Sequence, residues 1–288
     1  MSPAAAVSQN DYAEAIGRTE RRRAVIDAEK VDALASALDL DTAPGEGGTL
    51  PPGWHWMFFN PFVKRSELGH DGHPQRGGFL PAVELPRRMW AGGRLSYFGR
   101  LSVGIAAERE SEITDVSAKS GRAGNLVFVT VHHRIYQKDE LLVEEHQDIV
   151  YREAPQPGAP AAVPAAAPEG ARWSEAFHPD ATLLFRYSAL TSNGHRIHYD
   201  QPYATQEEGY PGLVVHGPLI STLLQGLAER TEPAGRLARF TFRGMAPLFV
   251  GRKFHLEAAP NGEGAGLSLW ARGPDGELAM RADAEFSI

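Results

Sequence analysis

Alternating apolar and polar residues dominate two long parts of the chain. Between residues 95 and 151, every second residue of several runs is apolar, as in the segment 127–133 (VFVTVHH). This period of two is typical of antiparallel strands with one buried face. Turn-forming residues at 121–125 and 138–140 predict hairpins between these strands. Residues 236–287 repeat the pattern, so the sequence predicts a second set of antiparallel strands there.

Apolar residues recur at helical spacing in two other segments. One is 28–40, where Asp27 is placed to cap the first turn. The other is the strongly apolar segment 217–230. Residues 11–28 show a polar, helix-like pattern, whereas residues 184–190 alternate as a strand would. We therefore expect one main helix to accompany each set of strands.

A stretch of low complexity divides the chain. Residues 154–171 are almost entirely Ala, Pro and Gly and carry a single charge, which predicts a semi-extended linker. It separates an N-terminal half, residues 10–153, from a C-terminal half, residues 172–288. In each half a sheet wrapped around one apolar helix would bury the apolar faces of both. The predicted fold class is α+β, with two similar halves that face each other.

Composition and charge limit the classes of function. The chain has 288 residues, 42% hydrophobic and 23% charged, with a net charge of −7. This balance argues against binding to nucleic acid, and the short Arg run 21–23, flanked by acids, favours solvated or paired arginines. The absence of cysteine excludes disulfides and thiolate chemistry. Without an apolar run of membrane-spanning length or a visible secretion signal, we expect a cytoplasmic protein with no membrane partner.

Residues 54–93 fit no single regular element. Five aromatic residues lie close together at the start, and the segment 70–93 follows with five glycines and three prolines. Structured loops of this length often carry function. A packed surface loop that covers the core explains the composition equally well, so both interpretations stay open.

Polar side chains gather in the turn at 191–200, which holds Asn193, His195, His198 and Asp200. A neutral histidine beside an amide can orient one water molecule and exchange its proton near neutral pH. The amide cannot titrate and can only hold the water or the imidazole. A structural role in the turn is the plainer interpretation for each residue. His195, His198 and Asp200 lack the spacing of an established metal motif, so no metal is predicted.

His216, Gly217 and Pro218 stand directly before the apolar helix. N–H groups at a helix start are free and lie at the positive end of the helix dipole. Gly217 allows a ligand to approach the backbone closely. A thioester carbonyl at this position would be polarised as negative charge develops on its oxygen. Together with His198, this arrangement predicts addition of water to an α,β-unsaturated thioester.

Four stretches carry a family resemblance. FRYSALTSNGHRIHYDQPYA (185–204) and GYPGLVVHGPL (209–219) resemble the MaoC-like, type 2 hydroxyacyl-thioester dehydratase branch of the hotdog superfamily. DGHPQRGGFLPAVELPRRMWAGG (71–93) and GRAGNLVFVTV (121–131) are similar to the N-terminal hotdog of the same two-hotdog proteins. The resemblance covers about residues 10–288. It implies a double hotdog, with an antiparallel sheet around a long helix in each half, and chemistry without a metal or a redox cofactor.

The resemblance also implies roles for individual residues. The family motif is Asp, then four residues, then His, and Asn193 and His198 stand at its two ends. His198 is then the single acid–base residue, Asn193 positions water or substrate, and Gly217 supplies the amide that binds the thioester oxygen. His216 is expected to bind substrate. The N-terminal half would supply the wall of the acyl-thioester groove, giving one site per chain.

The predicted function is a hydratase or dehydratase acting on a 2-enoyl or 3-hydroxyacyl-CoA thioester, of the mesaconyl-C4-CoA (itaconyl-CoA) hydratase type. Arg76, Arg87 and Arg88 are candidates to pair with a CoA phosphate or a substrate carboxylate. Salt bridges that hold the long loop are an equal interpretation of these arginines. The alternatives are a 3-hydroxyacyl-ACP dehydratase, a non-catalytic acyl-CoA-binding protein and a thioesterase. A homodimer is compatible with the sequence.

Overall fold

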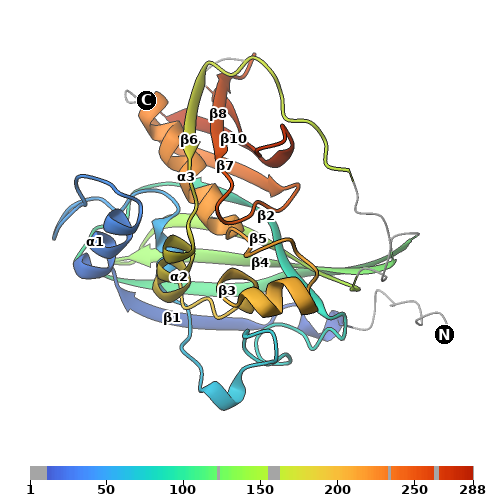
Figure 1. The fold of residues 1–288 in the computed structure, drawn as a ribbon. Helices are drawn as coiled ribbons and strands as arrows, with labels where there is room; N and C mark the ends of the chain where they lie inside the picture. The colour runs from blue at the N-terminus through green and yellow to red at the C-terminus, as the bar shows by residue number, and fades with distance from the viewer. Residues whose placement is uncertain (1–11, 122–123, 155–162, 233–234, 263–265, 288) are drawn as a thin grey trace.

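The computed structural model describes residues 12–121, 124–154, 163–232, 235–262 and 266–287. The described strands form one antiparallel sheet in the order β1-β3-β4-β5-β2-β7-β10-β9-β8-β6 (Figure 1). The strands are β1 (Thr19–Val25), β2 (Arg87–Tyr97), β3 (Ala106–Gly121), β4 (Gly124–Gln137), β5 (Glu140–Arg152), β6 (Trp173–Phe177), β7 (Arg236–Gly244), β8 (Phe254–Pro260), β9 (Gly266–Arg272) and β10 (Leu278–Ser287). The helices are α1 (Ala28–Ala37), α2 (Ala181–Leu190) and α3 (Gly217–Thr231), with short turns η1 (Ala13–Ala15), η2 (Trp54–Met57), η3 (Arg65–Glu67), η4 (Arg196–His198) and η5 (Tyr203–Glu207).

The two halves of the chain share this sheet. Strands β1 to β5 come from the N-terminal half and β6 to β10 from the C-terminal half, and β2 pairs with β7 where they meet. Helix α1 belongs to the first half, and α3 packs against β7, β8, β9 and β10 of the second. This arrangement agrees with the predicted α+β fold, in which each half combines antiparallel strands with one main helix (Figure 1).

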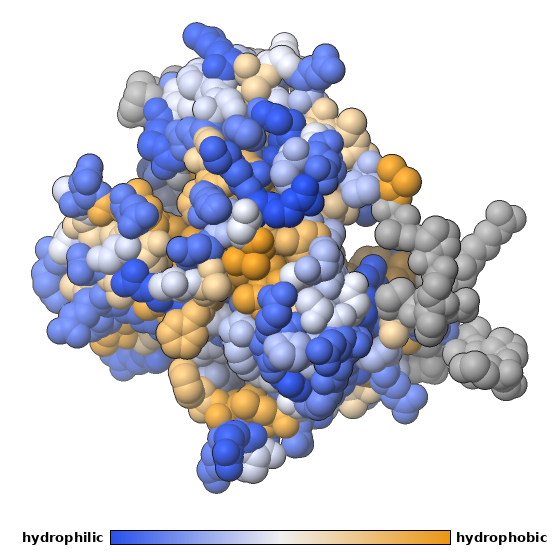
Figure 2. All heavy atoms as spheres, in the orientation of Figure 1, coloured by the Kyte–Doolittle hydropathy of each residue, from blue (hydrophilic) through white to orange (hydrophobic). Residues whose placement is uncertain are grey.

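Helix α3 is the apolar centre of the C-terminal half. Leu219, Leu224 and Leu227 are each at most 1% exposed and belong to a core that also contains Val31 and Leu34 of α1. Their helical spacing in the sequence reflects this one-sided burial. At the surface, Figure 2 shows a face that is polar over most of its area, with apolar residues gathered near its middle.

Two predicted elements are wrong. Residues 184–190 belong to α2 and not to a strand, because Asp180 accepts a hydrogen bond from the Leu183 amide (2.7 Å) and caps a helix. Residues 12–28 contain η1 and the strand β1, which pairs with β3. Arg21 of β1 forms ion pairs with Glu108 and Glu110 of β3. Pairing with a neighbouring strand outweighs local helix propensity here.

Other predictions agree with the structure. Strand β3 pairs antiparallel with β4, and β4 with β5; residues 122–123 of the first predicted turn lie outside the described residues. Helix α1 begins after Asp27, which accepts a hydrogen bond from the Lys30 amide (2.9 Å). Part of the predicted linker, residues 155–162, lies outside the described residues. The described remainder is not a free spacer, because the Ala167 amide donates to the Gly276 carbonyl and the Leu278 amide at the start of β10 donates to the Ala165 carbonyl. Within the described ranges, no helix is both long and apolar enough to cross a bilayer.

Candidate active site

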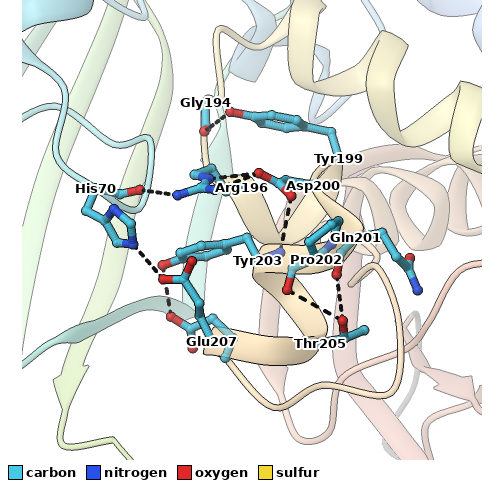
Figure 3. Close-up of polar contacts among 11 residues, drawn as sticks. His70, Gly194, Arg196, Tyr199, Asp200, Gln201, Pro202, Tyr203, Thr205 and Glu207 are labelled. Atoms are coloured by element: carbon cyan, nitrogen blue, oxygen red, sulfur yellow. Dashed lines mark hydrogen bonds and ion pairs between the residues drawn. The ribbon is translucent and has the colours of Figure 1, made fainter.

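The polar turn after α2 is held in place by its own side chains (Figure 3). Asp200 accepts hydrogen bonds from the Tyr203 amide (3.1 Å) and from the Arg196 guanidinium (3.0 and 2.8 Å). Arg196 also donates to the carbonyl of His70 (3.1 Å), which ties the turn to the N-terminal half. Asp200 therefore has the structural role that was the plainer reading of the sequence.

His198 lies at the end of η4, and its side chain is 7% exposed. Its Nδ1 is 2.7 Å from the carbonyl oxygen of Val214. A carbonyl can only accept a hydrogen bond, so Nδ1 carries the proton and Nε2 of the neutral ring is left with a lone pair. Burial lowers the pKa of His198 to about 4. The side chain is therefore an unprotonated base at neutral pH.

His216 connects this base to the start of α3. The two imidazole rings stack with centroids 3.7 Å apart, and the His216 ring is fully buried. The Nε2 atom of His216 lies 2.8 Å from the Ser188 hydroxyl of α2. Burial, followed by the neighbouring His198 and His195, keeps the pKa of His216 well below its usual value. The His216 ring packs against the His198 ring. The expected contact of His216 with substrate stays a prediction.

Gly217 begins α3 at a partly exposed position. No atom lies within 4 Å of the position a Cβ would take, so the backbone here faces open space. The first intrahelical bond is the one that Ile220 donates to the His216 carbonyl (3.1 Å). The Gly217 and Leu219 amides precede that bond, and Pro218 has no N–H. Leu219 is fully buried, whereas Gly217 is partly exposed, so the Gly217 amide is the free N–H group that a ligand carbonyl can reach at the start of α3.

Asn193 has a local bond that the sequence did not reveal. Its Oδ1 accepts a hydrogen bond from the His195 amide (3.1 Å), which stabilises the turn. This bond occupies the side-chain oxygen and leaves the NH₂ group to hold water or substrate. The predicted positioning role of Asn193 stays a prediction.

The structure brings Asp71 and His73 to the site, and the sequence analysis missed both. Asp71 Oδ2 lies 3.0 Å from His73 Nδ1, and the ring centroids of His73 and His195 are 4.2 Å apart. The rings of His195 and His198 are perpendicular, with centroids 5.6 Å apart. The available signal was the DGH sequence at 71–73, which stands in the long loop far from the histidine turn in sequence.

Asp71, His73 and His195 also offer one ligand atom each within 4.8 Å of one another, a spacing that suits a metal ion. Two histidines and one carboxylate are a common donor set for divalent transition metals. The bond between Asp71 and the ring of His73 uses one of these donors within the protein. The prediction of no metal therefore needs a direct test at this cluster.

The three candidate arginines have different surroundings. Arg76 donates to the carbonyls of Val83, Leu85 and Pro86, and so fixes the long loop. Arg87 forms an ion pair with Glu208 (2.9 Å) and donates to its carbonyl, which joins β2 to the C-terminal half. For Arg76 and Arg87, the loop-holding interpretation describes these contacts.

Arg88 is placed differently from Arg76 and Arg87. Its charge lowers the pKa values of His73 and His195 as a secondary effect behind burial, so its guanidinium lies near the histidine cluster. Within the described residues, Arg88 forms no ion pair with a carboxylate. It is therefore the candidate cation whose charge acts on both His73 and His195.

Comparison with known proteins shows which family the chain is similar to. Residues 53–250 match the family model described as hydroxyacyl-thioester dehydratase type 2. Over 284 residues, covering 97% of this chain and 99% of the relative, the chain is 48% identical to mesaconyl-C(4)-CoA hydratase of Chloroflexus aurantiacus.

Solved structures share the fold at low sequence identity. A MaoC-like dehydratase from Phytophthora capsici is 11% identical, with a TM-score of 0.69 and 98% coverage of both chains. A Mycobacterium tuberculosis protein described as a double hotdog fold is 15% identical, with a TM-score of 0.55, 96% coverage of this chain and 98% of that one. The predicted double hotdog is thus confirmed.

Proposed function

The chain belongs to the hydroxyacyl-thioester dehydratase type 2 family and is a hydro-lyase, and we propose that it hydrates mesaconyl-C4-CoA or a close 2-enoyl-CoA relative. One structural observation supports the reaction above all others. A neutral imidazole, that of His198, stacks on His216, the residue that precedes the buried helix α3, and the Nε2 of His198 has no partner among the described residues. An imidazole base and the N–H group at a helix start are the two groups that addition of water to an unsaturated thioester requires.

In the proposed mechanism, the oxygen of water forms a bond to the β-carbon of the thioester while His198 Nε2 takes one of the water protons. The π electrons of the double bond move onto the thioester oxygen. The amide of Gly217 stabilises that oxygen as its negative charge develops. The α-carbon then takes a proton from the imidazolium, which restores neutral His198. Dehydration follows the same steps in reverse.

The proposed substrate has a free carboxylate besides its thioester. Arg88 is the cation that we assign to it, because it forms no ion pair with a carboxylate among the described residues and its charge acts on both His73 and His195. Arg87 is paired with Glu208, and Arg76 is bonded to backbone carbonyls of the long loop. A planar guanidinium binds a carboxylate through two parallel hydrogen bonds. We also propose that residues 10–153 supply the wall of the acyl-thioester groove, and that each chain has one site.

The test of the reaction is His198→Ala. Removing the base should lower kcat by about a hundredfold to ten-thousandfold while the circular dichroism spectrum stays that of the wild type. Loss of enoyl-thioester absorbance reports turnover. Unchanged turnover in this variant would show that His198 is not the base.

A substrate panel tests the acyl group. Mesaconyl-C4-CoA should be hydrated with a higher kcat/KM than crotonyl-CoA, which lacks the second carboxylate. The Arg88→Gln variant should lose most of this preference, because one bidentate ion pair contributes roughly 1.5–3 kcal/mol.

Release of free thiol instead of hydration would identify a thioesterase, and binding without turnover would identify a non-catalytic acyl-CoA-binding protein.

A further inference from the structure

His198 has no carboxylate partner within its own turn. In the family motif the position of Asn193 is an Asp, and an amide cannot supply the negative charge of a carboxylate. The only oxygen bonded to the His198 ring among the described residues is the neutral carbonyl of Val214. When His198 takes a proton, its positive charge therefore forms in a buried place without a local counter-charge.

The carboxylate that contacts the histidine cluster, Asp71, comes from the other half of the chain. Asp71 binds His73 twice, through Oδ2 to the ring Nδ1 (3.0 Å) and through Oδ1 to the backbone amide (3.0 Å). The His73 ring lies against His195, and His195 lies against His198. A continuous row of imidazoles thus joins the Asp71 carboxylate to the proposed base.

The loop that carries Asp71 is docked firmly on the histidine turn. The Arg196 amide donates to the carbonyl of Asp71 (2.9 Å), and the Arg196 guanidinium donates to the carbonyl of His70 (3.1 Å). Gly72, with φ of +85°, lies so close to the turn that a Cβ would be 1.9 Å from the carbonyl oxygen of Gly194. Backbone contact of this kind fixes Asp71 relative to the row of rings.

Other charges around the cluster are mostly unfavourable to an imidazolium. Burial lowers the pKa of His73, with Arg88 and Arg76 adding to the effect, while the hydrogen bond that the ring donates to Asp71 opposes it. Burial likewise lowers the pKa of His195, as do His73, His198 and Arg88, and again Asp71 opposes the shift. Asp71 is thus the anion that favours a protonated ring in both cases.

We propose that Asp71, acting through His73, is the counter-charge of the active-site histidines and takes the place of the carboxylate that is absent at Asn193. His73 and Asp71 are positioning residues, since neither needs to exchange a proton with substrate. The N-terminal half thereby completes the active site and does more than form its wall. This inference rests on the proposed hydratase function.

The first test is Asp71→Asn, which keeps the size of the side chain and the acceptor for the His73 amide. We expect kcat to fall at least about tenfold with KM nearly unchanged, because the lost charge stabilises the transition state and not the bound substrate. The control is Glu207→Gln, which removes a carboxylate bonded to the neighbouring His70 and should leave kcat unchanged. An Asp71→Asn variant with wild-type kcat would overturn the proposal.

The second test moves the carboxylate. In the double variant Asp71→Asn with Asn193→Asp, the negative charge returns to the histidine turn, and most of the lost kcat should return with it. A purely structural role of Asp71 in its loop would give no such rescue, so a double variant as slow as the single one counts against the proposal.

Two further measurements separate the remaining outcomes. Titration of ¹⁵N-labelled histidines by NMR needs no turnover, so it tests the inference even if no thioester is hydrated. Asp71→Asn should lower the pKa values of the clustered histidines His73, His195 and His198, and unaltered values would refute the role of Asp71 as counter-charge.

Dialysis against EDTA should leave activity intact. Loss of activity that Zn²⁺ restores would instead assign Asp71, His73 and His195 to a metal site.

Discussion

Two glycines, Gly72 and Gly194, allow backbone from the two halves of the chain to meet beside the histidine row. A Cβ on either residue would lie within 2.4 Å of a carbonyl oxygen of the other. Gly72 also has φ of +85°, a conformation that other residues adopt only at a cost. The positions of Asp71 and His195 therefore depend on the adjacent residues Gly72 and Gly194, which leave room for this backbone contact.

Gly72→Ala should lower both stability and kcat. The positive φ costs roughly 1–2 kcal/mol, and the collision with Gly194 pushes the 69–74 loop away from the turn. The matched control is Gly276→Ala, which has the same φ of +85° but open space around its Cβ. Urea unfolding should show a loss of stability in both variants, whereas kcat should fall only for Gly72→Ala. Equal kcat values would show that loop docking is irrelevant to catalysis.

At the scale of elements, periodicity predicted the helices and hairpins whose burial is one-sided, such as α3. It failed for α2, because Leu183, Leu184, Tyr187 and Ser188 are buried on one helical face and can also be read as a short strand. Local sequence was enough to propose His198 and Gly217 as candidates, and their roles stay predictions. Asp71 and His73 could not, since only the docking of one half on the other brings them to the turn.

Elements from the two halves are also joined by a buried polar chain. Tyr97 of β2 accepts a hydrogen bond from the Gly53 amide (3.1 Å), and its hydroxyl donates to Gln225 Oε1 of α3 (2.5 Å). Burial raises the pKa of Tyr97, so this hydroxyl keeps its proton at every working pH. The bond anchors α3 to the strand next to the shared centre of the sheet.

Tyr97→Phe should reduce the free energy of unfolding by about 1–3 kcal/mol, because it leaves the Gly53 amide and the Gln225 oxygen buried without a partner. Tyr136→Phe is the control, since the hydroxyl of Tyr136 on β4 makes no hydrogen bond in the described part of the chain. Urea titration measures both. If Tyr97→Phe lowers the free energy of unfolding no more than the control does, these hydrogen bonds do not stabilise the contact between β2 and α3.

At the scale of the whole molecule, both halves bury neutral histidines. His133 of β4 is 6% exposed and bonded to the Ser111 hydroxyl (2.8 Å) and to Gln147 Oε1 (3.1 Å). Burial, followed by the charge of Arg109, lowers its pKa to about 4. His198 has a pKa of about 4 as well, for the reason of burial. Lowering the pH should therefore destabilise the N-terminal and the C-terminal half over the same pH range.

The sign of the resulting pH dependence follows from the protons bound. Between pH 6.5 and about 4, an unfolded histidine is protonated while His133 and His198 in the folded chain are not, so the unfolded state binds more protons. Stability should be fully present above pH 6.5 and fall as the pH drops towards 4, by about 3 kcal/mol for each histidine. Asp71, whose pKa is lowered, loses its contribution only below its unfolded pKa of 3.8 and adds nothing in this window.

Urea unfolding measured from pH 7.5 to 4.5 checks this expectation. The free energy of unfolding should fall steeply below pH 6.5, and His133→Gln should make the slope shallower because one buried imidazole no longer takes up a proton on unfolding. His178→Gln removes an exposed histidine and should leave the slope unchanged. A wild-type stability that is flat across this range would contradict the burial of neutral histidines. It would also remove the ground for treating His198 as an unprotonated base, because the same burial that weakens the fold in acid keeps its Nε2 free at neutral pH.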